Sequence, residues 1–142
     1  MSINPACFHP RTSLREFLQV SSAAGFGCVE ISIQQAMALA DDLGGLAVLA
    51  RVGSDLGLQI GQFSGLLPAG PVLPAPLLVG QRAWHAAQSS LAARLEAGAA
   101  LGCHKAAVTC NPRTNLNLKE ARRIAALRLT TLATEASRYG VT

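Results

Sequence analysis

The feature of this sequence that most constrains its fold is a junction at which a helical segment ends in glycine and a β-branched segment follows. Its fullest copy is the stretch 23–33, AAGFGCVEISI. Many helices end in a residue with a left-handed backbone conformation, which glycine adopts without strain. The spacing of the copies, 32, 45 and 38 residues, matches a strand followed by a crossover helix. The sequence therefore predicts an alternating α/β chain, with junctions at Gly25, Gly57, Gly102 and Gly140.

Length and composition agree with one such domain, covering residues 1–142. Half of the residues are apolar and only 4% are aromatic, which favours helices packed tightly on a sheet over an all-β sandwich. No run of about 18 apolar residues is present, and the N-terminus lacks the pattern of a signal peptide. We expect a cytoplasmic protein that does not bind membranes.

Hydrophobic periodicity and capping residues place the individual elements. Ser13 and Glu16 form a capping box for the first helix, and Asn117 and Glu120 open the last one. The expected strands are 2–8, 28–33, 58–63 and 105–110, with a fifth beginning at Val141, and the expected helices are 13–24, 43–56, 82–101 and 117–139.

The stretch 64–81 interrupts this pattern. It contains four prolines and no charged residue, so it cannot continue a helix or a central strand. A loop this long in a compact domain is often a binding segment or a lid. An inert connection or a partner-contact surface remains an equal alternative.

The second strand divides its side chains by alternation. Val29, Ile31 and Ile33 point to one face, and Cys28, Glu30 and Ser32 to the other. If the apolar face lies under helices, Glu30 points to the opposite side, which is the lumen in a closed parallel barrel.

These motifs in this order resemble the xylose isomerase-like TIM-barrel superfamily, which includes sugar phosphate isomerases and epimerases. The resemblance rests on short scaffold motifs: 13–16 (SLRE), 24–30 (AGFGCVE), 57–58 (GL), 99–102 (AALG) and 136–141 (ASRYGV). It implies the first half of a (βα)8 barrel, built from about four strand-helix repeats.

The resemblance also implies a divalent metal, Mn, Mg, Co or Zn, and a sugar or polyol substrate isomerised through an enediolate. The metal ligands of the sugar-handling members lie on strands five to eight. This chain ends at Thr142, so none can be assigned and we expect it to be inactive alone. Endonuclease IV-like members carry metal-binding histidines after strands three and four; here those places hold 62–64 (QFS) and 109–111 (TCN).

Four residues are candidates for substrate contact or support of the site. Glu30 matches the acidic residue that closes strand two in relatives, although a purely structural carboxylate is the alternative. His9 follows the first strand, and Asn111 and Arg113 follow the fourth, where arginine could clamp an anion. His85 and His104 are expected to be structural, on an outer helix and at the amino end of a strand.

The cysteines and basic residues have simpler interpretations. We expect Cys7, Cys28, Cys103 and Cys110 to behave as buried thiols, since they form no C-x-x-C pair. A zinc site at 103–110 is disfavoured because adjacent strand residues face opposite sides. The basic residues of the last helix predict a solvated face and no nucleic-acid partner.

Three hypotheses remain open: an isomerase or epimerase completed by further sequence, a non-catalytic α/β binding or structural module, and a nucleic-acid-processing relative, in that order. A half barrel would expose unpaired backbone at both sheet edges. We therefore expect that a homodimer could form through these edges.

Overall fold

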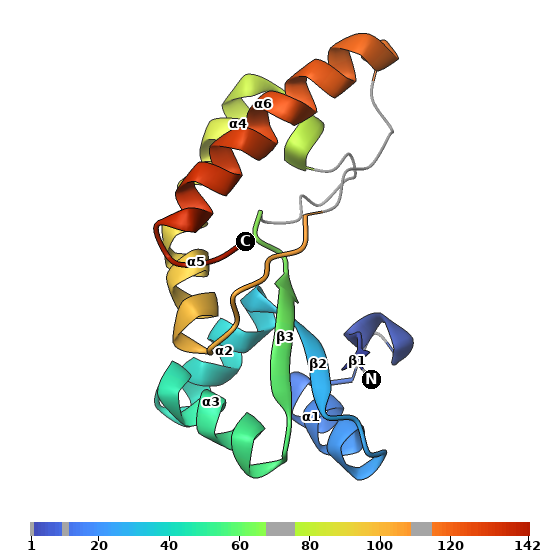
Figure 1. The fold of residues 1–142 in the computed structure, drawn as a ribbon, viewed down its shortest axis with the longest axis vertical. Helices are drawn as coiled ribbons and strands as arrows, with labels where there is room; N and C mark the ends of the chain where they lie inside the picture. The colour runs from blue at the N-terminus through green and yellow to red at the C-terminus, as the bar shows by residue number, and fades with distance from the viewer. Residues whose placement is uncertain (1, 10–11, 68–75, 109–114) are drawn as a thin grey trace.

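Parallel strands alternate with helices along the chain (Figure 1). The computed structural model describes residues 2–9, 12–67, 76–108 and 115–142. Within these residues the strands are β1 (Ser2–Ile3), β2 (Cys28–Ser32) and β3 (Gln59–Ser64). The helices are η1 (Pro5–Cys7) and η2 (Pro76–Leu78), both 3-10, and α1 (Leu14–Ala23), α2 (Ile33–Leu43), α3 (Leu46–Asp55), α4 (Gln81–Gln88), α5 (Leu91–Ala100) and α6 (Leu118–Ser137).

The strands lie in the sheet in the order in which they occur in the chain. β1 pairs with β2 and β2 with β3, both in parallel. Beyond β3 the backbone ladder continues, because hydrogen bonds join Phe63 to Lys105 and Ala107 (3.0 and 2.7 Å) and Thr142 to His104 and Ala106 (both 2.8 Å). A doubly wound sheet reverses its strand order at a switch point. The order here is that of a barrel wall, which confirms the predicted parallel (βα) units and half-barrel architecture.

The predicted junctions are confirmed at their glycines. Gly25, Gly57, Gly102 and Gly140 have φ angles of 80°, 68°, 71° and 66°, in the left-handed region that glycine adopts without strain. The predicted N-caps are also confirmed, since Ser13 Oγ accepts from the Glu16 amide at 3.2 Å and Asn117 Oδ1 accepts from the Glu120 amide at 2.9 Å.

Two element boundaries differ from the prediction near the N-terminus. The first strand ends at Ile3 and not at residue 8, because Pro5 begins the 3-10 helix η1. The helix predicted over 43–56 is α3, which begins at Leu46, and α2 was not predicted as a helix; Gly44, whose φ is 94°, separates the two. The sequence also predicts that Asp41 and Asp42 precede a helix N-terminus, but they lie in the last turn of α2.

The helix predicted over 82–101 is divided into α4 and α5 at Ser89 and Ser90. The helical spacing of its apolar residues predicts one inner stripe, and this is confirmed. Trp84, Ala87, Leu91, Leu95 and Leu101 are all buried. The stripe continues through the break because both helices present their apolar sides to the same core.

The core fills the space between the helices and one face of the sheet. Val29 and Ile31 of β2 and Phe63 of β3 are at most 1% exposed and belong to this cluster. The closest packing joins Phe63 to Gly98 of α5, where a Cβ atom would lie only 2.3 Å from the phenyl ring, so glycine is required there.

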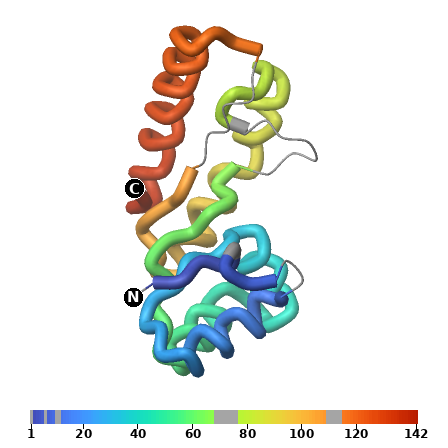
Figure 2. Tube along the Cα trace, turned by 90° about the vertical axis from the view of Figure 1, so that its right-hand side faces the viewer, coloured from blue at the N-terminus to red at the C-terminus, as the bar shows by residue number. Residues whose placement is uncertain are grey.

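α4 and α6 lie beside each other and extend beyond the strands, as the two views agree (Figures 1 and 2). Arg128 of α6 connects them, since its guanidinium lies 4.8 Å from the centroid of the Trp84 ring. Arg128 is buried, which corrects the prediction of a wholly solvated basic face. The apolar spacing of the last helix also predicts that Leu127 faces inward, but its side chain is 59% exposed.

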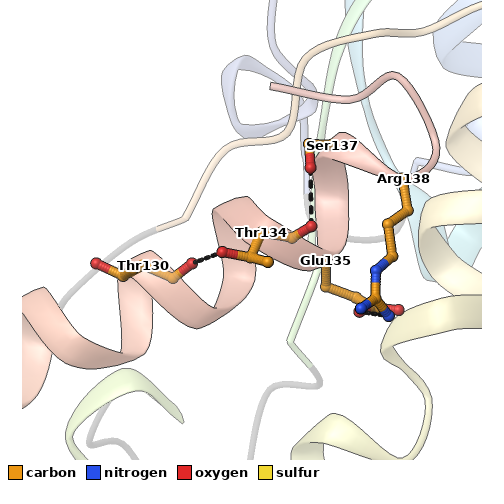
Figure 3. Close-up of polar contacts among 5 residues, drawn as sticks. All are labelled: Thr130, Thr134, Glu135, Ser137 and Arg138. Atoms are coloured by element: carbon orange, nitrogen blue, oxygen red, sulfur yellow. Dashed lines mark hydrogen bonds and ion pairs between the residues drawn. The ribbon is translucent and has the colours of Figure 1, made fainter.

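Hydroxyl groups on the exposed side of α6 donate hydrogen bonds to backbone carbonyls of the same helix (Figure 3). Thr134 donates to the Thr130 carbonyl at 2.9 Å, Ser137 donates to the Thr134 carbonyl at 2.8 Å, and Arg138 pairs with Glu135 at 2.8 Å. These local bonds let polar residues occupy the helix interior. In the described part of the chain, no helix has both the length and the apolar character needed to cross a membrane.

Candidate functional site

The most prominent polar contact on the sheet joins Glu30 of β2 to Gln62 of β3. Gln62 Nε2 donates to Glu30 Oε2 at 2.6 Å, and both residues are half-buried. Glu30 alternates with Val29 and Ile31, which are buried under the helices, so its carboxylate lies on the opposite face of the sheet. We call this the concave face, because it is the side that would face the lumen of a closed barrel. The predicted orientation of Glu30 agrees with this placement, and its functional role is untested.

A β-bulge at Gly61 brings Gln62 opposite Glu30. Val29 pairs with Ile60 but Glu30 pairs with Gln62, so Gly61 is the additional residue. The bulge reverses the alternation of β3, which allows both Ile60 and Phe63 to be buried while Gln62 faces Glu30. Sequence alternation alone could not predict Gln62 as the partner, and the glycine within a strand was the available signal.

Two serines continue the polar row toward the carboxyl ends of the strands. Ser64 Oγ donates to the Ile31 carbonyl at 3.4 Å, and Ser32 Oγ accepts from the Gln35 amide at 3.5 Å, capping α2. Both hydroxyls thus hydrogen-bond backbone groups of the fold. Glu30 retains its Oε1 atom for other contacts, since only Oε2 receives the Gln62 amide.

His9 lies in a separate place, a cavity of about 210 Å³ between the loop after β1 and the first turns of α1 and α2. We call this cavity the rim pocket. Among the described residues, its apolar walls are Pro5, Phe8, Leu14 and Phe17, and its polar groups come from His9, Thr12 and Gln35. Glu30 does not line it, so the structure does not bring His9 and Glu30 into one site.

The remaining candidate residues either lie outside the described part of the chain or make structural contacts. Asn111 and Arg113 lie outside the described residues, as does Cys110. His85 is exposed on α4, where it hydrogen-bonds Gln81 at 2.9 Å, and His104 contacts the Gly140 carbonyl at 3.1 Å. These two contacts are structural, in line with the expectation for both histidines.

The thiols are not uniformly buried. Cys103 is fully buried, Cys28 is half-buried and Cys7 is exposed, so the expectation is wrong for Cys7. Burial raises the pKa of the Cys103 thiol, a backbone hydrogen bond at Lys105 lowers it, and nearby Cys28 raises it further. Cys103 is therefore a protonated core residue without the thiolate character of a reactive cysteine.

Two arginines that the sequence did not single out hold the ends of the proline-rich stretch. Arg94 donates to the Gly65 carbonyl at its start, and Arg128 donates to the Leu77 and Val79 carbonyls at its end, both at 2.7 Å. Burial lowers the pKa of both guanidinium groups. Their donors are directed to backbone carbonyls, so their role is to anchor the chain.

The described residues do not fit a metal centre. No group of three or more His, Cys, Asp or Glu side chains is assembled among them. Glu30 supplies one carboxylate, and its neighbour Gln62 already occupies one of the two oxygens. The metal expected from the resemblance therefore finds no ligand set in this part of the chain.

Comparison with known proteins identifies the architecture. No protein-family model matches the sequence, and a search of curated proteins also found no match. A xylose isomerase domain protein from Alicyclobacillus acidocaldarius matches the structure with a TM-score of 0.76 and 20% identity, over 99% of this chain and 47% of that one. The chain has the fold of the N-terminal half of a xylose isomerase-like TIM barrel.

Two further solved structures support this xylose isomerase-like half barrel. An IolI protein with a bound zinc atom matches with a TM-score of 0.77 at 18% identity, and a D-psicose 3-epimerase with D-fructose matches at 0.74 and 15%. Each covers 99% of this chain, which in turn covers 49% and 50% of them. The half barrel thus spans about half the length of the structures it resembles.

Proposed function

We propose that this chain forms the strand-two and strand-three side of a sugar-binding site in an isomerase- or epimerase-like (βα)8 protein. The observation that carries the proposal is the Glu30–Gln62 pair on the concave face of parallel strands. In barrel enzymes, substrates bind at the carboxyl ends of such strands. Proteins of the same fold include a D-psicose 3-epimerase and an IolI protein with a bound zinc atom.

The roles of the two side chains follow from their hydrogen-bonding capacity. Glu30 can accept a substrate hydroxyl through Oε1, while Gln62 fixes the carboxylate through Oε2 and retains its own amide oxygen as an acceptor. Gln62 is thus a positioning residue and Glu30 the sugar contact. Isomerisation beside a carbonyl also needs a base and an electrophile, which we assign to no described residue.

The test measures ketose binding at the Gln62 side chain. In a two-dimensional ¹H–¹⁵N spectrum of the 142-residue chain, D-fructose should shift the Gln62 side-chain amide in a saturable manner. Glu30→Gln should weaken this binding about tenfold or more, because it removes a charged hydrogen-bond acceptor. Glu96→Gln, which changes an exposed glutamate on α5, is the matched control and should have no effect.

A Gln62 amide that does not respond to any ketose would favour the alternative, a non-catalytic α/β binding or structural module. An equal response in the wild type and in Glu30→Gln would reject Glu30 as the sugar contact.

We also propose that two copies associate through the sheet edges. Among the described strands, β1 has a single neighbour, β2, and its outer backbone edge is open. Open edges favour pairing with another strand. Sedimentation equilibrium of the 142-residue chain should give the mass of a dimer, and a monomer at all concentrations would contradict this.

A further inference from the structure

We propose that the concave face binds a small zwitterion, a molecule with an ammonium group at one end and a carboxylate at the other, as in β-amino acids. The ammonium group would bind Glu30 and the carboxylate would bind Lys105. This site shares Glu30 with the proposed sugar-binding face and rests on the same placement of that residue. It adds a side chain from the next segment of the sheet, and it does not depend on sugar binding.

Lys105 lies beside Gln62 in the sheet. Phe63 and Ala106 form a parallel bridge, in which the Phe63 amide donates to the Lys105 carbonyl at 3.0 Å. The residues that precede this bridge on the two segments, Gln62 and Lys105, are therefore neighbours as well. Because Glu30 pairs with Gln62, a carboxylate, an amide and an ammonium group form one row across the sheet.

The Lys105 side chain belongs to the same face as the other two members of the row. Ala106 and Val108 pack against the hydrophobic core. Alternate residues of an extended segment point to opposite faces, so Lys105 points away from that core, as Gln62 does. Lys105 is exposed, which agrees with a position on the concave face.

The two charges of the row are not neutralised by each other or by neighbours. All eight acidic side chains of the sequence lie in the described part of the chain, and no ion pair formed there includes Lys105. Among the described residues, Glu30 accepts only the neutral amide of Gln62, through Oε2. The row therefore offers a carboxylate oxygen at one end and an ammonium group at the other.

The spacing of the row defines the ligand. Two strand intervals separate the Cα atoms of Glu30 and Lys105 by roughly 9–10 Å. With a charge-assisted hydrogen bond at each end, about 4 Å is left between the two charged groups of a ligand. An extended β-amino acid has this separation, and the flexible stem of Lys105 can adjust to it. A ligand with a single charge would meet a like charge at the other end of the row.

Binding at this open face should be weak and sensitive to salt. Glu30 is half-buried and Lys105 is exposed, so water and ions screen the contact with Lys105 in particular. We expect a dissociation constant of roughly 10 mM at low ionic strength. Raising the NaCl concentration to about 0.5 M should weaken binding severalfold.

The experiment compares β-alanine with propionate and propylamine, which each lack one of its two charged groups. Added to the ¹⁵N-labelled 142-residue chain, β-alanine should shift the Gln62 side-chain amide and the Lys105 backbone amide in a saturable manner. Propionate and propylamine should each bind at least about fivefold more weakly. Lys105→Gln should weaken β-alanine binding about tenfold. Lys119→Gln is the matched control, because Lys119 is the other lysine of the chain and is exposed on α6.

The outcomes separate this site from the sugar-binding proposal. A loss of β-alanine binding in Lys105→Gln, with the D-fructose response of Gln62 unchanged, supports the zwitterion site. Equal binding of β-alanine and propionate, or equal effects of Lys105→Gln and Lys119→Gln, would overturn it. A response to D-fructose without saturable binding of β-alanine up to about 100 mM would also overturn it and leave the sugar proposal intact. The reverse result would overturn the sugar proposal alone.

Discussion

The two faces of the sheet are built on different principles. The outer face is apolar and dry, with Val29, Ile31 and Phe63 at most 1% exposed beneath the helices. The concave face carries Glu30 and Gln62, both half-buried and joined to each other. Both faces come from the same short strands, because alternate residues point in opposite directions.

This difference shows which face holds the fold together and which is available for binding. Packing in the interior leaves little free volume, so changes on the outer face should alter the free energy of unfolding strongly. Changes on the concave face meet solvent or a side chain that can rotate. Four substitutions test this division through chemical denaturation.

The largest expected effect is that of Gly98→Ala on the outer face. The new Cβ would lie 2.3 Å from Phe63 Cε1 and 2.7 Å from Cζ, and the ring cannot move away within the core. We expect a loss of about 3 kcal/mol or more in the free energy of unfolding, at the upper end of the cost of overpacking. The midpoint of urea denaturation measures it.

Gly53→Ala is the matched control, because Gly53 is also buried within a helix but its Cβ would meet only the Leu58 carbonyl at 3.7 Å. Without a clash, alanine should stabilise α3 by about 0.5–1 kcal/mol. Equal effects of the two substitutions would show that helix propensity and not contact with Phe63 explains Gly98.

A smaller loss is expected from Gly61→Ala at the bulge of the concave face. Its Cβ would lie 2.5 Å from Cys28 Sγ, but a cysteine side chain can rotate to another rotamer. We expect a loss of about 1–2 kcal/mol, measured by the same denaturation midpoint. In the Cys28→Ala background the loss should largely disappear, and a loss that persists there would place the strain in the backbone.

The fold was predictable where local chemistry decides it. The four glycine junctions, the Ser13 and Asn117 caps and the buried stripe of α4 and α5 all depend on residues close in sequence. The break at Ser89 was missed because the apolar stripe continues through it, and the helix α2 was not predicted. Arg128 was missed because its burial depends on distant partners, Trp84 and the Leu77 carbonyl.

The candidate site was predictable only in part for the same reason. Glu30 was placed on the concave face from the alternation of its own strand. The position of its partner Gln62 depends on a bulge in the next strand. The rim pocket forms only where three elements meet in space. Such contacts between elements are absent from any local pattern.

Ser21→Ala also changes the packing beneath the helices, but we expect it to raise the free energy of unfolding and not to lower it. Ser21 lies on α1, its side chain is fully buried, and its hydroxyl has no hydrogen-bond partner among the described residues. Removing an unsatisfied buried hydroxyl should stabilise the protein by about 1 kcal/mol. Ser22→Ala is the control: Ser22 Oγ donates to the Leu56 carbonyl at 2.7 Å, so its loss should destabilise by about 1 kcal/mol.

The smallest effect is expected from Gln62→Ala on the concave face. The substitution removes the 2.6 Å hydrogen bond to Glu30, but the carboxylate is only half-buried and water can replace the lost amide donor. We expect a change of less than about 1 kcal/mol in the free energy of unfolding, from the same urea titrations. A loss as large as that of Gly98→Ala would mean that the Glu30–Gln62 pair is part of the structural core, and the concave face would then no longer be the surface reserved for a ligand.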